Sequence, residues 1–419
     1  MSYLPRICDT ELQNALATMG AVLIEGAKWC GKTTAASNIA RSTLFMQDPD
    51  NARSYHEMAD TKPSLLLKGE TPRLIDEWQM SPVLWDAVRF EIDKRRSTGQ
   101  FILTGSAVPV DNVTAHTGTG RFARILMRPM SLYESRESNG TVSLAGLFDE
   151  KYDIESVSDL SIEQIAFAIC RGGFPATIGK SDTTALRMSV DYVEAIINHD
   201  ISRVDGVEKN PNRVRLLLRS LARNIATTAS AQTILKDIES AETTISDKTF
   251  GVYYNALRRI FVVETMPAWS PSLRSKTAIR TSPKHHFVDP SIATAVMRIN
   301  PAGVLHDFEY FGFLFEALCA RDVRIYAQNN DGDVFHYRDK SGLEADMIVA
   351  LRDGRWGAVE VKLGNRQIEQ ATENLLKLKE KINAEKMREP SFLMVLTGGQ
   401  YAFRRKDGVF IVPIGCLKN

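Results

Sequence analysis

The residue types that bind phosphate occur together near the amino end of the chain. They form the pattern G-x-x-x-x-G-K-T, followed by one more threonine: Gly26, Ala27, Lys28, Trp29, Cys30, Gly31, Lys32, Thr33 and Thr34. Glycines without a Cβ let such a loop turn its backbone N–H groups inward, where they and the next helix's N-terminus attract phosphate oxygens. In this pattern Lys32 reaches the β- and γ-phosphates and the Thr33 hydroxyl ligates Mg²⁺. The pattern therefore predicts a site for ATP and Mg²⁺ at residues 26–34.

A pair of acidic residues follows a second apolar run. Asp76 and Glu77 end the stretch that begins at Pro72, about 45 residues beyond the glycine-rich loop. An acid at the carboxyl end of a strand can hold Mg²⁺ through water, and the acid after it can orient the attacking water. We expect these roles for Asp76 and Glu77, respectively; the alternative is an ordinary solvated pair of acids in a loop.

Two hydroxyl residues end a third apolar run, Phe101–Ser106. In P-loop ATPases with an added strand between the two nucleotide motifs, a residue here contacts the water or the γ-phosphate. We assign Ser106 first and Thr104 second; the alternative is a simple turn at a strand end.

Arginines follow the polar, glycine-rich stretch Thr114–Gly120. Arg121 comes first, and we expect it to stabilise γ-phosphate charge in the transition state. It would act within its own chain or from a neighbouring subunit of a homo-oligomer, and the sequence leaves both open. Pairing with a surface acid is the other alternative, and the catalytic role is less favoured for Arg124.

A second set of ionisable residues lies in the last third of the chain. Asp346 belongs to the apolar run 343–351 and Glu360 and Lys362 to the run 356–362, with an Asp-Gly turn signal between the runs. Glu360 and Lys362 should point to the same side of their strand. Two carboxylates can hold Mg²⁺ while the lysine orients or activates water at a phosphodiester. Glu316, on a preceding helix, would complete the cluster; the alternative is a surface ion-pair ladder.

These residues need a framework of strands and helices. Short apolar runs alternate with helical patterns over the first 130 residues, which predicts an α/β domain with a parallel sheet. Three helical stretches and a strand then follow in winged-helix order. Residues 200–285 hold 14 Lys/Arg and 8 acids, a net charge of +6 that includes Arg215, Arg219 and Arg223. This excess suits contact with a DNA backbone, but it also suits an ordinary solvated face or an interdomain adaptor.

Composition excludes several classes of protein. The chain has 419 residues, 44% of them hydrophobic and 25% charged, with a net charge of +1, so any attraction to nucleic acid must be local. Its amino end lacks the apolar region of a secretory signal, and no apolar run reaches membrane-spanning length. The five cysteines are scattered without metal-ligand spacing. We therefore expect a cytoplasmic protein with no membrane partner.

The motifs together resemble those of the prokaryotic AAA-type P-loop ATPases that carry a C-terminal DUF4143 region. The resemblance extends to Leu103–Ser106, Pro129–Ser131, Gly172–Pro175 and Phe287–Pro290. It implies three domains: an ATPase domain over 1–180, a winged-helix-like module over 185–285 and a restriction-endonuclease-like domain over 286–419. Glu344–Asp346 and Glu360–Lys362 resemble the PD-(D/E)xK type of nuclease motif. The loop interior, residues 27–30, differs from the Pro-Arg-Gln-Val of many relatives, at positions whose side chains do not usually contact phosphate.

Two functions remain open at this point. The first is a Mg²⁺-dependent ATPase associated with DNA through a nuclease-like C-terminal domain. The second is a nucleotide-dependent switch or adaptor in which that domain is an inert scaffold. The complete set of Asp346, Glu360 and Lys362 favours the first, whereas the near-zero net charge favours the second.

Overall fold

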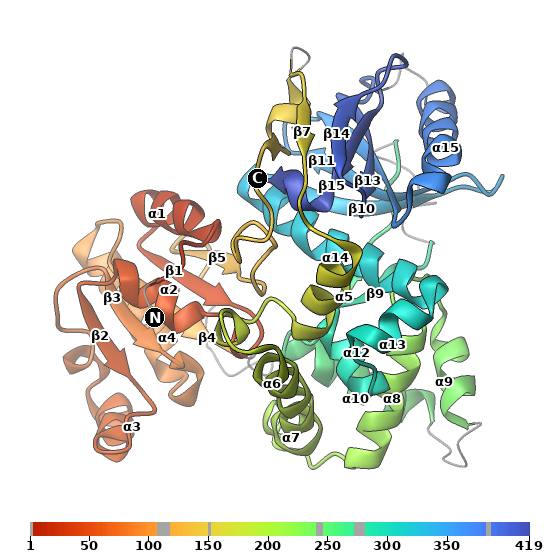
Figure 1. Ribbon diagram of the computed structural model, residues 1–419. Helices are drawn as coiled ribbons and strands as arrows, with labels where there is room; N and C mark the ends of the chain where they lie inside the picture. The colour runs from red at the N-terminus through yellow and green to blue at the C-terminus, as the bar shows by residue number, and fades with distance from the viewer. Residues whose placement is uncertain (1–2, 107–117, 150–151, 240–245, 272–280, 383–386) are drawn as a thin grey trace. The chain divides into compact units, whose positions relative to one another are not determined.

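The computed structural model describes residues 3–106, 118–149, 152–239, 246–271, 281–382 and 387–419 (Figure 1). Residue contacts divide the chain into two compact units. The first contains Met1–Pro129, His199–Glu208 and Asn255–Val262. The second contains Met130–Asn198, Lys209–Tyr254 and Val263–Asn419.

A parallel sheet of five strands is the centre of the first unit, in the order β2-β3-β4-β1-β5. The strands are β1 (Ala21–Glu25), β2 (Ser42–Phe45), β3 (Arg73–Asp76), β4 (Phe101–Gly105) and β5 (Phe122–Leu126). The predicted α/β class with a parallel sheet is thus confirmed. β4 lies between β1 and β3, as expected for an added strand between the two nucleotide motifs.

Helices cover both faces of this sheet: α1 (Cys8–Thr18), α2 (Lys32–Ile39), α3 (Ala52–Thr61) and α4 (Val83–Arg95). Side chains of β1 alternate between two apolar clusters. Val22 packs in the cluster that holds α1 and α2 residues, and Leu23 in the cluster that holds α3 and α4 residues. Burial on both faces explains why the parallel strands have nearly continuous apolar sequences.

The chain between residues 162 and 329 is largely helical. Its helices include α5 (Ile162–Arg171), α6 (Asp182–Ala195), α7 (Ile201–Arg203), α8 (Pro211–Arg223), α9 (Ala231–Glu239), α10 (Asp247–Arg259), α12 (Ser291–Met297), α13 (Pro301–His306) and α14 (Phe308–Asn329), with a π-helical turn, η5, at Ile196–Asp200. Ser246 caps α10, because its Oγ accepts a hydrogen bond from the Thr249 amide (3.2 Å). The strands β8 (Val263–Met266) and β9 (Lys284–Phe287) pair antiparallel. α8, α9, α10 and β8 match the expected order of three helical stretches and a strand, whereas the winged-helix fold itself stays a prediction.

A sheet of seven strands dominates the end of the second unit, in the order β10-β11-β12-β13-β15-β14-β7. Its strands are β10 (Gly332–Arg338), β11 (Glu344–Leu351), β12 (Trp356–Lys362), β13 (Phe392–Thr397), β14 (Tyr401–Arg404), β15 (Phe410–Pro413) and β7 (Glu155–Val157). α15 (Ile368–Lys381) packs on it through Ala371, Leu375 and Leu378. α14 contacts β10, β11 and β12.

Two short strands join this region from far away in the sequence. β7 pairs with β14, and β6 (Val142–Ser143) pairs with β16 (Leu417–Lys418). The predicted boundary placed β6 and β7 in the domain 1–180, whereas residue contacts put both strands in the second unit. Strands of two and three residues carry too little hydrophobic pattern to reveal their partners.

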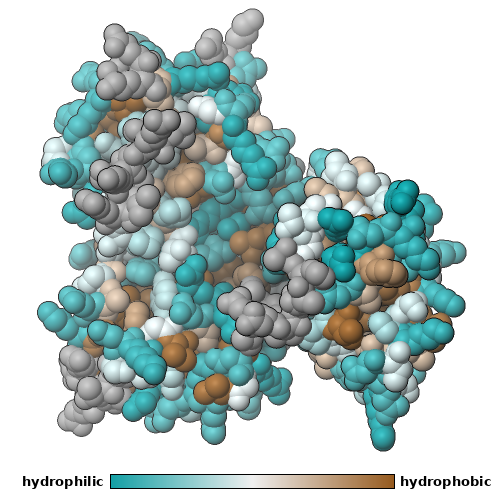
Figure 2. All heavy atoms as spheres, turned by 180° about the vertical axis from the view of Figure 1, so that it is seen from behind, coloured by the Kyte–Doolittle hydropathy of each residue, from teal (hydrophilic) through white to brown (hydrophobic). Residues whose placement is uncertain are grey.

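The described helices include none that is long and apolar enough to cross a membrane. The face shown in Figure 2 is mostly hydrophilic, and its apolar residues lie in separate patches.

Candidate functional site

The glycine-rich loop joins β1 to α2 in the first unit. Gly26 (φ 150°) and Gly31 (φ 100°) have backbone conformations that favour glycine. A Cβ at Gly26 would lie 2.1 Å from the Met127 carbonyl oxygen, so no other residue fits there. Lys32 is 5% exposed, and its Nζ donates hydrogen bonds to the carbonyl oxygens of Gly26 (2.9 Å) and Ala27 (2.8 Å). The lysine ammonium thus lies against the inside of the loop, where the motif places phosphate.

The predicted Mg²⁺ ligands of this site are in direct contact. Oδ1 of Asp76, at the end of β3, accepts a hydrogen bond from the Thr33 hydroxyl at 2.7 Å. The same oxygen accepts a second bond from the Thr104 hydroxyl of β4 at 2.6 Å. Parallel strands bring their carboxyl ends to one edge of the sheet, and this explains why three distant segments meet at Asp76.

Glu77, the predicted catalytic acid, is held by two neighbours. Its Oε2 accepts hydrogen bonds from the Ser106 hydroxyl (3.1 Å) and from the Gln79 amide. Glu77 also has a left-handed backbone (φ 53°), a strained conformation that is commonest at functional sites. Ser106, which follows β4, therefore contacts Glu77, whereas Thr104 of β4 contacts Asp76. Each of the two acids thus has one hydroxyl partner from this part of the chain. A Cβ on the intervening Gly105 would lie 3.0 Å from Gln79 Oε1.

Two further residues support the loop, and no sequence motif predicts them. The buried Arg6 donates to the carbonyl oxygens of Cys30 (2.6 Å) and Arg128 (2.8 Å). Lys28 Nζ lies 2.6 Å from Oδ1 of Asp200, at the end of the π-helical turn η5. Neither Arg6 nor Asp200 belongs to a recognisable motif, although a π-helical turn often marks a functional position.

The other predicted residues of the loop differ in exposure. Trp29 is 50% exposed with φ 65°, whereas Ala27 and Cys30 are fully buried. The Thr34 side chain is exposed on the first turn of α2.

Arg121 lies at the wrong edge of the sheet for a role in its own chain. It precedes β5, and its carbonyl oxygen accepts a hydrogen bond from Ala21, the first residue of β1. The glycine-rich loop follows the last residue of β1, so the strand's length separates the two. Arg121 pairs instead with Asp93 of α4 (2.9 Å). This geometry speaks against the alternative in which Arg121 acts within its own chain, and the pair with Asp93 matches the alternative of pairing with a surface acid. The sequence left these alternatives open because it did not show at which end of a strand the arginine would lie.

Arg124, the less favoured arginine, is on β5 itself. It pairs with Glu25 (3.0 Å), and its guanidinium lies 5.4 Å from the centre of the Trp85 ring. These contacts match the alternative of pairing with an acid.

The C-terminal acids and lysine converge, as predicted, in the second unit. Lys362 Nζ lies 2.8 Å from Glu360 Oε2 and 3.5 Å from Asp346 Oδ2. The backbone amide of Val361 donates to Asp346 Oδ2 at 2.8 Å. Glu360 and Lys362 point to the same side of β12, and the register that pairs Met347 with Val359 brings Asp346 beside them.

A second lysine, Lys284 of β9, completes this cluster. Its Nζ lies 2.6 Å from Glu316 Oε1 and 3.4 Å from Asp346 Oδ1. We name Lys284, Glu316, Asp346, Glu360 and Lys362 the carboxylate–lysine cluster.

Burial shifts the titration of these groups. It raises the pKa of Glu316 to about 7 and that of Glu360 to about 8, and the neighbouring Asp346 charge adds to both shifts. For Asp346, burial acts in the opposite direction to Lys284 and Lys362, and the lysines prevail and lower its pKa. Three carboxylates against two ammonium groups favour uptake of a proton.

The cluster is thus an ion-pair network in this state. Within the described residues, no group of three His, Cys, Asp or Glu is arranged to hold a metal ion. Lysine ammonium groups stand between the carboxylates of Glu316, Asp346 and Glu360. Their predicted metal role remains a prediction that requires one lysine to move.

The basic segment is partly neutralised. Arg215 forms a two-bond ion pair with Glu194 (both 2.8 Å), and Arg223 pairs with Asp237 (3.1 Å). Arg219 is exposed. Asp237 is already counted in the net charge of +6 for residues 200–285, whereas Glu194 lies outside them and neutralises one more of their positive charges.

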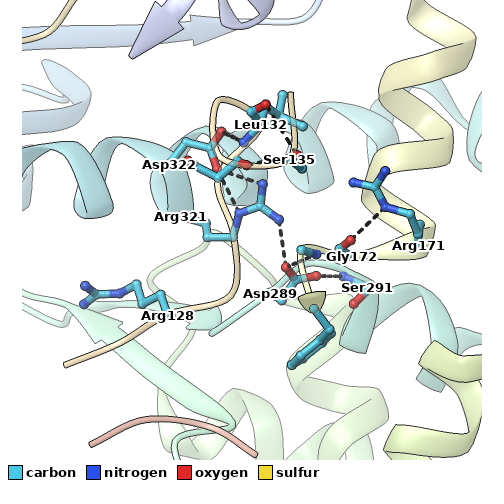
Figure 3. A network of polar contacts seen from close by, with 12 residues as sticks. Arg128, Leu132, Ser135, Arg171, Gly172, Asp289, Ser291, Arg321 and Asp322 are labelled. Carbon is cyan, nitrogen blue, oxygen red and sulfur yellow. Dashed lines mark hydrogen bonds and ion pairs between the residues drawn. The ribbon is translucent and has the colours of Figure 1, made fainter. Parts of the chain in front are cut away.

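Three short motifs that lie far apart in the sequence meet in one buried network: the end of Pro129–Ser131, Gly172–Pro175 and Phe287–Pro290 (Figure 3). Arg321 of α14 is paired with Asp289 (2.8 Å) and with Asp322 (2.7 Å), and all three side chains are at most 2% exposed. Asp289 also accepts hydrogen bonds from the amides of Gly173 and Ser291 (both 2.9 Å).

Asp322 joins the segment that follows Pro129 to the same arginine, Arg321. It accepts a hydrogen bond from the Leu132 amide (2.9 Å). Burial raises the pKa of Asp322 to about 6, although its pair with Arg321 opposes the rise. The segments after Pro129, around Gly173 and around Asp289 are therefore joined through α14.

Models of three known families match separate parts of the chain. An AAA domain matches residues 18–135, and the domain of unknown function DUF4143 matches residues 311–417. Another domain of unknown function, DUF8612, matches residues 162–303. The chain thus carries a P-loop AAA domain followed by a DUF4143 region.

Individual relatives are distant. The uncharacterized proteins Mb2031c of Mycobacterium bovis and Rv2008c of Mycobacterium tuberculosis are each 22% identical over 412 residues, which covers 97% of this chain and 83% of theirs. Among solved structures, the Walker-type ATPase PABY2304 of Pyrococcus abyssi is similar with a TM-score of 0.42 and 13% identity, covering 70% of this chain and 94% of that one. A DNA replication initiation factor has a TM-score of 0.25 at 12% identity, covering 61% of this chain and 92% of that one.

Proposed function

We propose that this protein binds ATP with Mg²⁺ at the glycine-rich loop and hydrolyses it. One observation carries the proposal: Asp76 Oδ1 accepts hydrogen bonds from both Thr33 and Thr104. This arrangement aligns the acid of β3 with the hydroxyl at the start of α2. A hydroxyl and a carboxylate are the oxygen ligands that Mg²⁺ prefers, so the residues present fit the ion.

Each residue then has a separate task. Mg²⁺, when bound, neutralises charge on the β- and γ-phosphates. Thr33 and Asp76 would hold it, and Lys32 would exchange its bonds to Gly26 and Ala27 for bonds to phosphate. Glu77, which Ser106 and Gln79 hold in place, would orient the attacking water and accept its proton.

Two substitutions test this assignment. Lys32→Ala should abolish ATP binding in isothermal titration calorimetry, because it removes the charge partner of the phosphates. Glu77→Gln keeps a similar shape, so ATP should still bind while turnover falls by about two to four orders of magnitude. Equal phosphate release by Glu77→Gln and the wild type would remove Glu77 from the mechanism.

Arg121 has a place in this proposal only across a subunit boundary. If it completes a neighbouring ATP site, turnover per chain should rise with protein concentration, and Arg121→Ala should lose that rise. Arg124→Ala is the matched control from the same strand region. A rate that is independent of concentration would leave Arg121 with its structural pair, Asp93.

A second proposed function concerns the carboxylate–lysine cluster. We infer that it is the site of a restriction-endonuclease-like domain acting on phosphodiesters, because Asp346, Glu360 and Lys362 converge with the PD-(D/E)xK spacing. Glu316 would be a further Mg²⁺ ligand and Lys362 the group that orients water. Helices α8–α10 with β8 and β9 would form the winged-helix-like module that contacts DNA.

The test is incubation of the protein with plasmid and single-stranded DNA, in Mg²⁺ or Mn²⁺, with and without ATP. Cleavage that disappears in Asp346→Asn supports the nuclease. Binding without cleavage would leave the rival function, a nucleotide-dependent adaptor with an inert scaffold. Replacing Arg215, Arg219 and Arg223 together should flatten the dependence of DNA affinity on salt.

A further inference from the structure

An ion pair joins the glycine-rich loop to a distant part of the chain. Lys28 lies in the loop between Gly26 and Gly31, and its Nζ is 2.6 Å from Oδ1 of Asp200. The Asp200 side chain is 12% exposed, against 43% for Lys28. A mostly buried carboxylate is costly without a partner of opposite charge. The loop therefore supplies the charge that Asp200 needs.

Asp200 belongs to an unusual piece of helix. It is the last residue of η5, the π-helical turn between α6 and α7. π-helical turns are rare and occur frequently at functional sites. An extra residue in a helix rotates the residues after it by about 100° about the axis, so the turn determines where the Asp200 carboxylate points. Ile196, Ile197 and Ile201 are at most 1% exposed and hold the turn in the core.

The chain passes from the second unit to the first inside this same turn. Asn198 ends a stretch of the second unit, and His199 begins a stretch of the first. α6, η5 and α7 follow one another without a break. A change at Asp200 therefore acts on the backbone hydrogen bonds of the helix that leads out of the second unit.

We propose that Asp200 is a nucleotide sensor: phosphate binding orders the glycine-rich loop, strengthens the Lys28–Asp200 pair and stiffens η5. This inference rests on the proposed ATP site, since it concerns the regulation of that site. An exposed lysine gains little from an ion pair, because ordering its long side chain costs entropy. Phosphate that already orders the loop removes part of this cost, so the pair forms more often. By thermodynamic linkage, the intact pair then also favours nucleotide binding.

The hydrogen bonds of Lys32 provide the route from phosphate to Lys28. Lys32 Nζ donates to the carbonyl oxygens of Gly26 (2.9 Å) and Ala27 (2.8 Å), and Ala27 directly precedes Lys28. When Lys32 exchanges these bonds for bonds to phosphate, both carbonyl oxygens lose a donor. The backbone next to Lys28 thus changes its bonding when ATP binds.

A second ion pair beside the loop offers a matched control. Arg124 pairs at 3.0 Å with Glu25, the residue before Gly26. Its side chains are 53% and 16% exposed, close to the values for Lys28 and Asp200. Arg124→Met therefore removes a similar pair next to the same loop, from a strand that does not include η5.

The experiment follows hydrogen exchange of residues 196–204 in the full chain by mass spectrometry, with and without Mg²⁺ and AMP-PNP, an ATP analogue that is not hydrolysed. Calorimetry on the same proteins sets a saturating concentration. We expect AMP-PNP to slow exchange of these amides by about two- to fivefold in the wild type. Lys28→Met and Asp200→Asn should lose this effect. Lys28→Arg, which keeps the charge, and Arg124→Met should retain it.

The AMP-PNP affinity of Asp200→Asn gives a second readout, whose sign separates two explanations. Removing a negative charge near a phosphate site would by itself tighten binding of an anion. Linkage through the pair predicts the opposite, a loss of affinity of about two- to fivefold. Tighter binding by Asp200→Asn would overturn the proposal.

Other contrary outcomes separate this inference from the proposed ATP site. If the wild type binds no AMP-PNP, the ATP site itself fails. If AMP-PNP binds but exchange of residues 196–204 does not change, the site stands and the sensor is refuted. Loss of the effect in Arg124→Met would show that any ion pair beside the loop suffices, and would overturn the role of Asp200. Should Asp200→Asn not fold, Lys28→Met breaks the same pair from its exposed side, and slowed exchange there refutes the proposal.

Discussion

Asp289 offers a sharp test of how the second unit is held together. In Asp289→Ala, the Arg321 guanidinium and the amides of Gly173 and Ser291 lose their common acceptor. Arg321 is 2% exposed, so water cannot readily replace the carboxylate. Arg321 keeps its pair with Asp322, so the cost comes from the three buried donors that lose their acceptor: one guanidinium N–H and two backbone amides. A buried donor without a partner costs about 1–3 kcal/mol. These terms overlap, so we expect a loss of about 3–5 kcal/mol of unfolding free energy in this unit.

Hydrogen exchange followed by mass spectrometry separates the two units in one experiment. Amides of α14 that exchange through unfolding should exchange faster by about two to four orders of magnitude in Asp289→Ala. Asp307→Ala is the matched control, because Asp307 is an exposed acid that caps the same helix through the Tyr310 amide (2.9 Å). It should cost only about 1 kcal/mol. Equal effects of the two substitutions on α14 would refute the reasoning that burial of the three donors sets the cost.

Three further predictions concern the two sites. Thr104→Val removes one of two hydrogen bonds to Asp76, so turnover should fall about tenfold, or about 1.4 kcal/mol, with unchanged ATP affinity, as phosphate release and calorimetry would show. Asp200→Asn breaks a partly exposed pair with Lys28 and should change ATP affinity by no more than about fivefold; a larger loss would mean that Asp200 shapes the loop itself. The stability of the second unit, followed by thermal unfolding with chelator present, should fall between pH 6.5 and 8. Glu316 and Glu360 have raised pKa values near 7 and 8, so the folded state binds protons that the unfolded state has released. Below pH 6.5 the lowered pKa values of His286 and His336 make the folded state less stable as the pH falls. Above pH 6.5, Glu360→Gln should weaken the dependence of stability on pH.

The sequence predicted which residues of the first site lie together, because most of them belong to one continuous stretch. Residues 26–34 form the loop and the start of a helix in one continuous stretch, so their spacing specifies their geometry. Asp76 and Thr104 are distant in sequence, yet each ends an apolar run. Parallel strands with connecting helices have few possible arrangements, so their meeting at one sheet edge was predictable.

Arg121 shows where this reasoning stops. Its residue type suits a γ-phosphate, but its function depends on whether it precedes or follows a strand. The described part of the chain resumes at Gly118, and β5 begins immediately after Arg121. An arginine that precedes a parallel strand lies at the edge opposite the glycine-rich loop, and apolar pattern alone did not locate this strand.

The carboxylate–lysine cluster shows a different limit. A hairpin with acids and a lysine predicts that Asp346, Glu360 and Lys362 meet, because antiparallel pairing has a fixed period. It does not predict Lys284, which reaches the cluster from another pair of strands, 62 residues before Asp346. The run Lys284-His285-His286-Phe287 did contain a signal, since three consecutive polar residues in a strand point to both of its faces, and the face toward the core must then bury at least one of them. The buried charges match the ion-pair alternative that the sequence left open, and the metal role stays a prediction. Three carboxylates face two lysines, so one carboxylate is left without a cationic partner, and an added proton on Glu316 or Glu360, whose pKa values are raised, would balance the network.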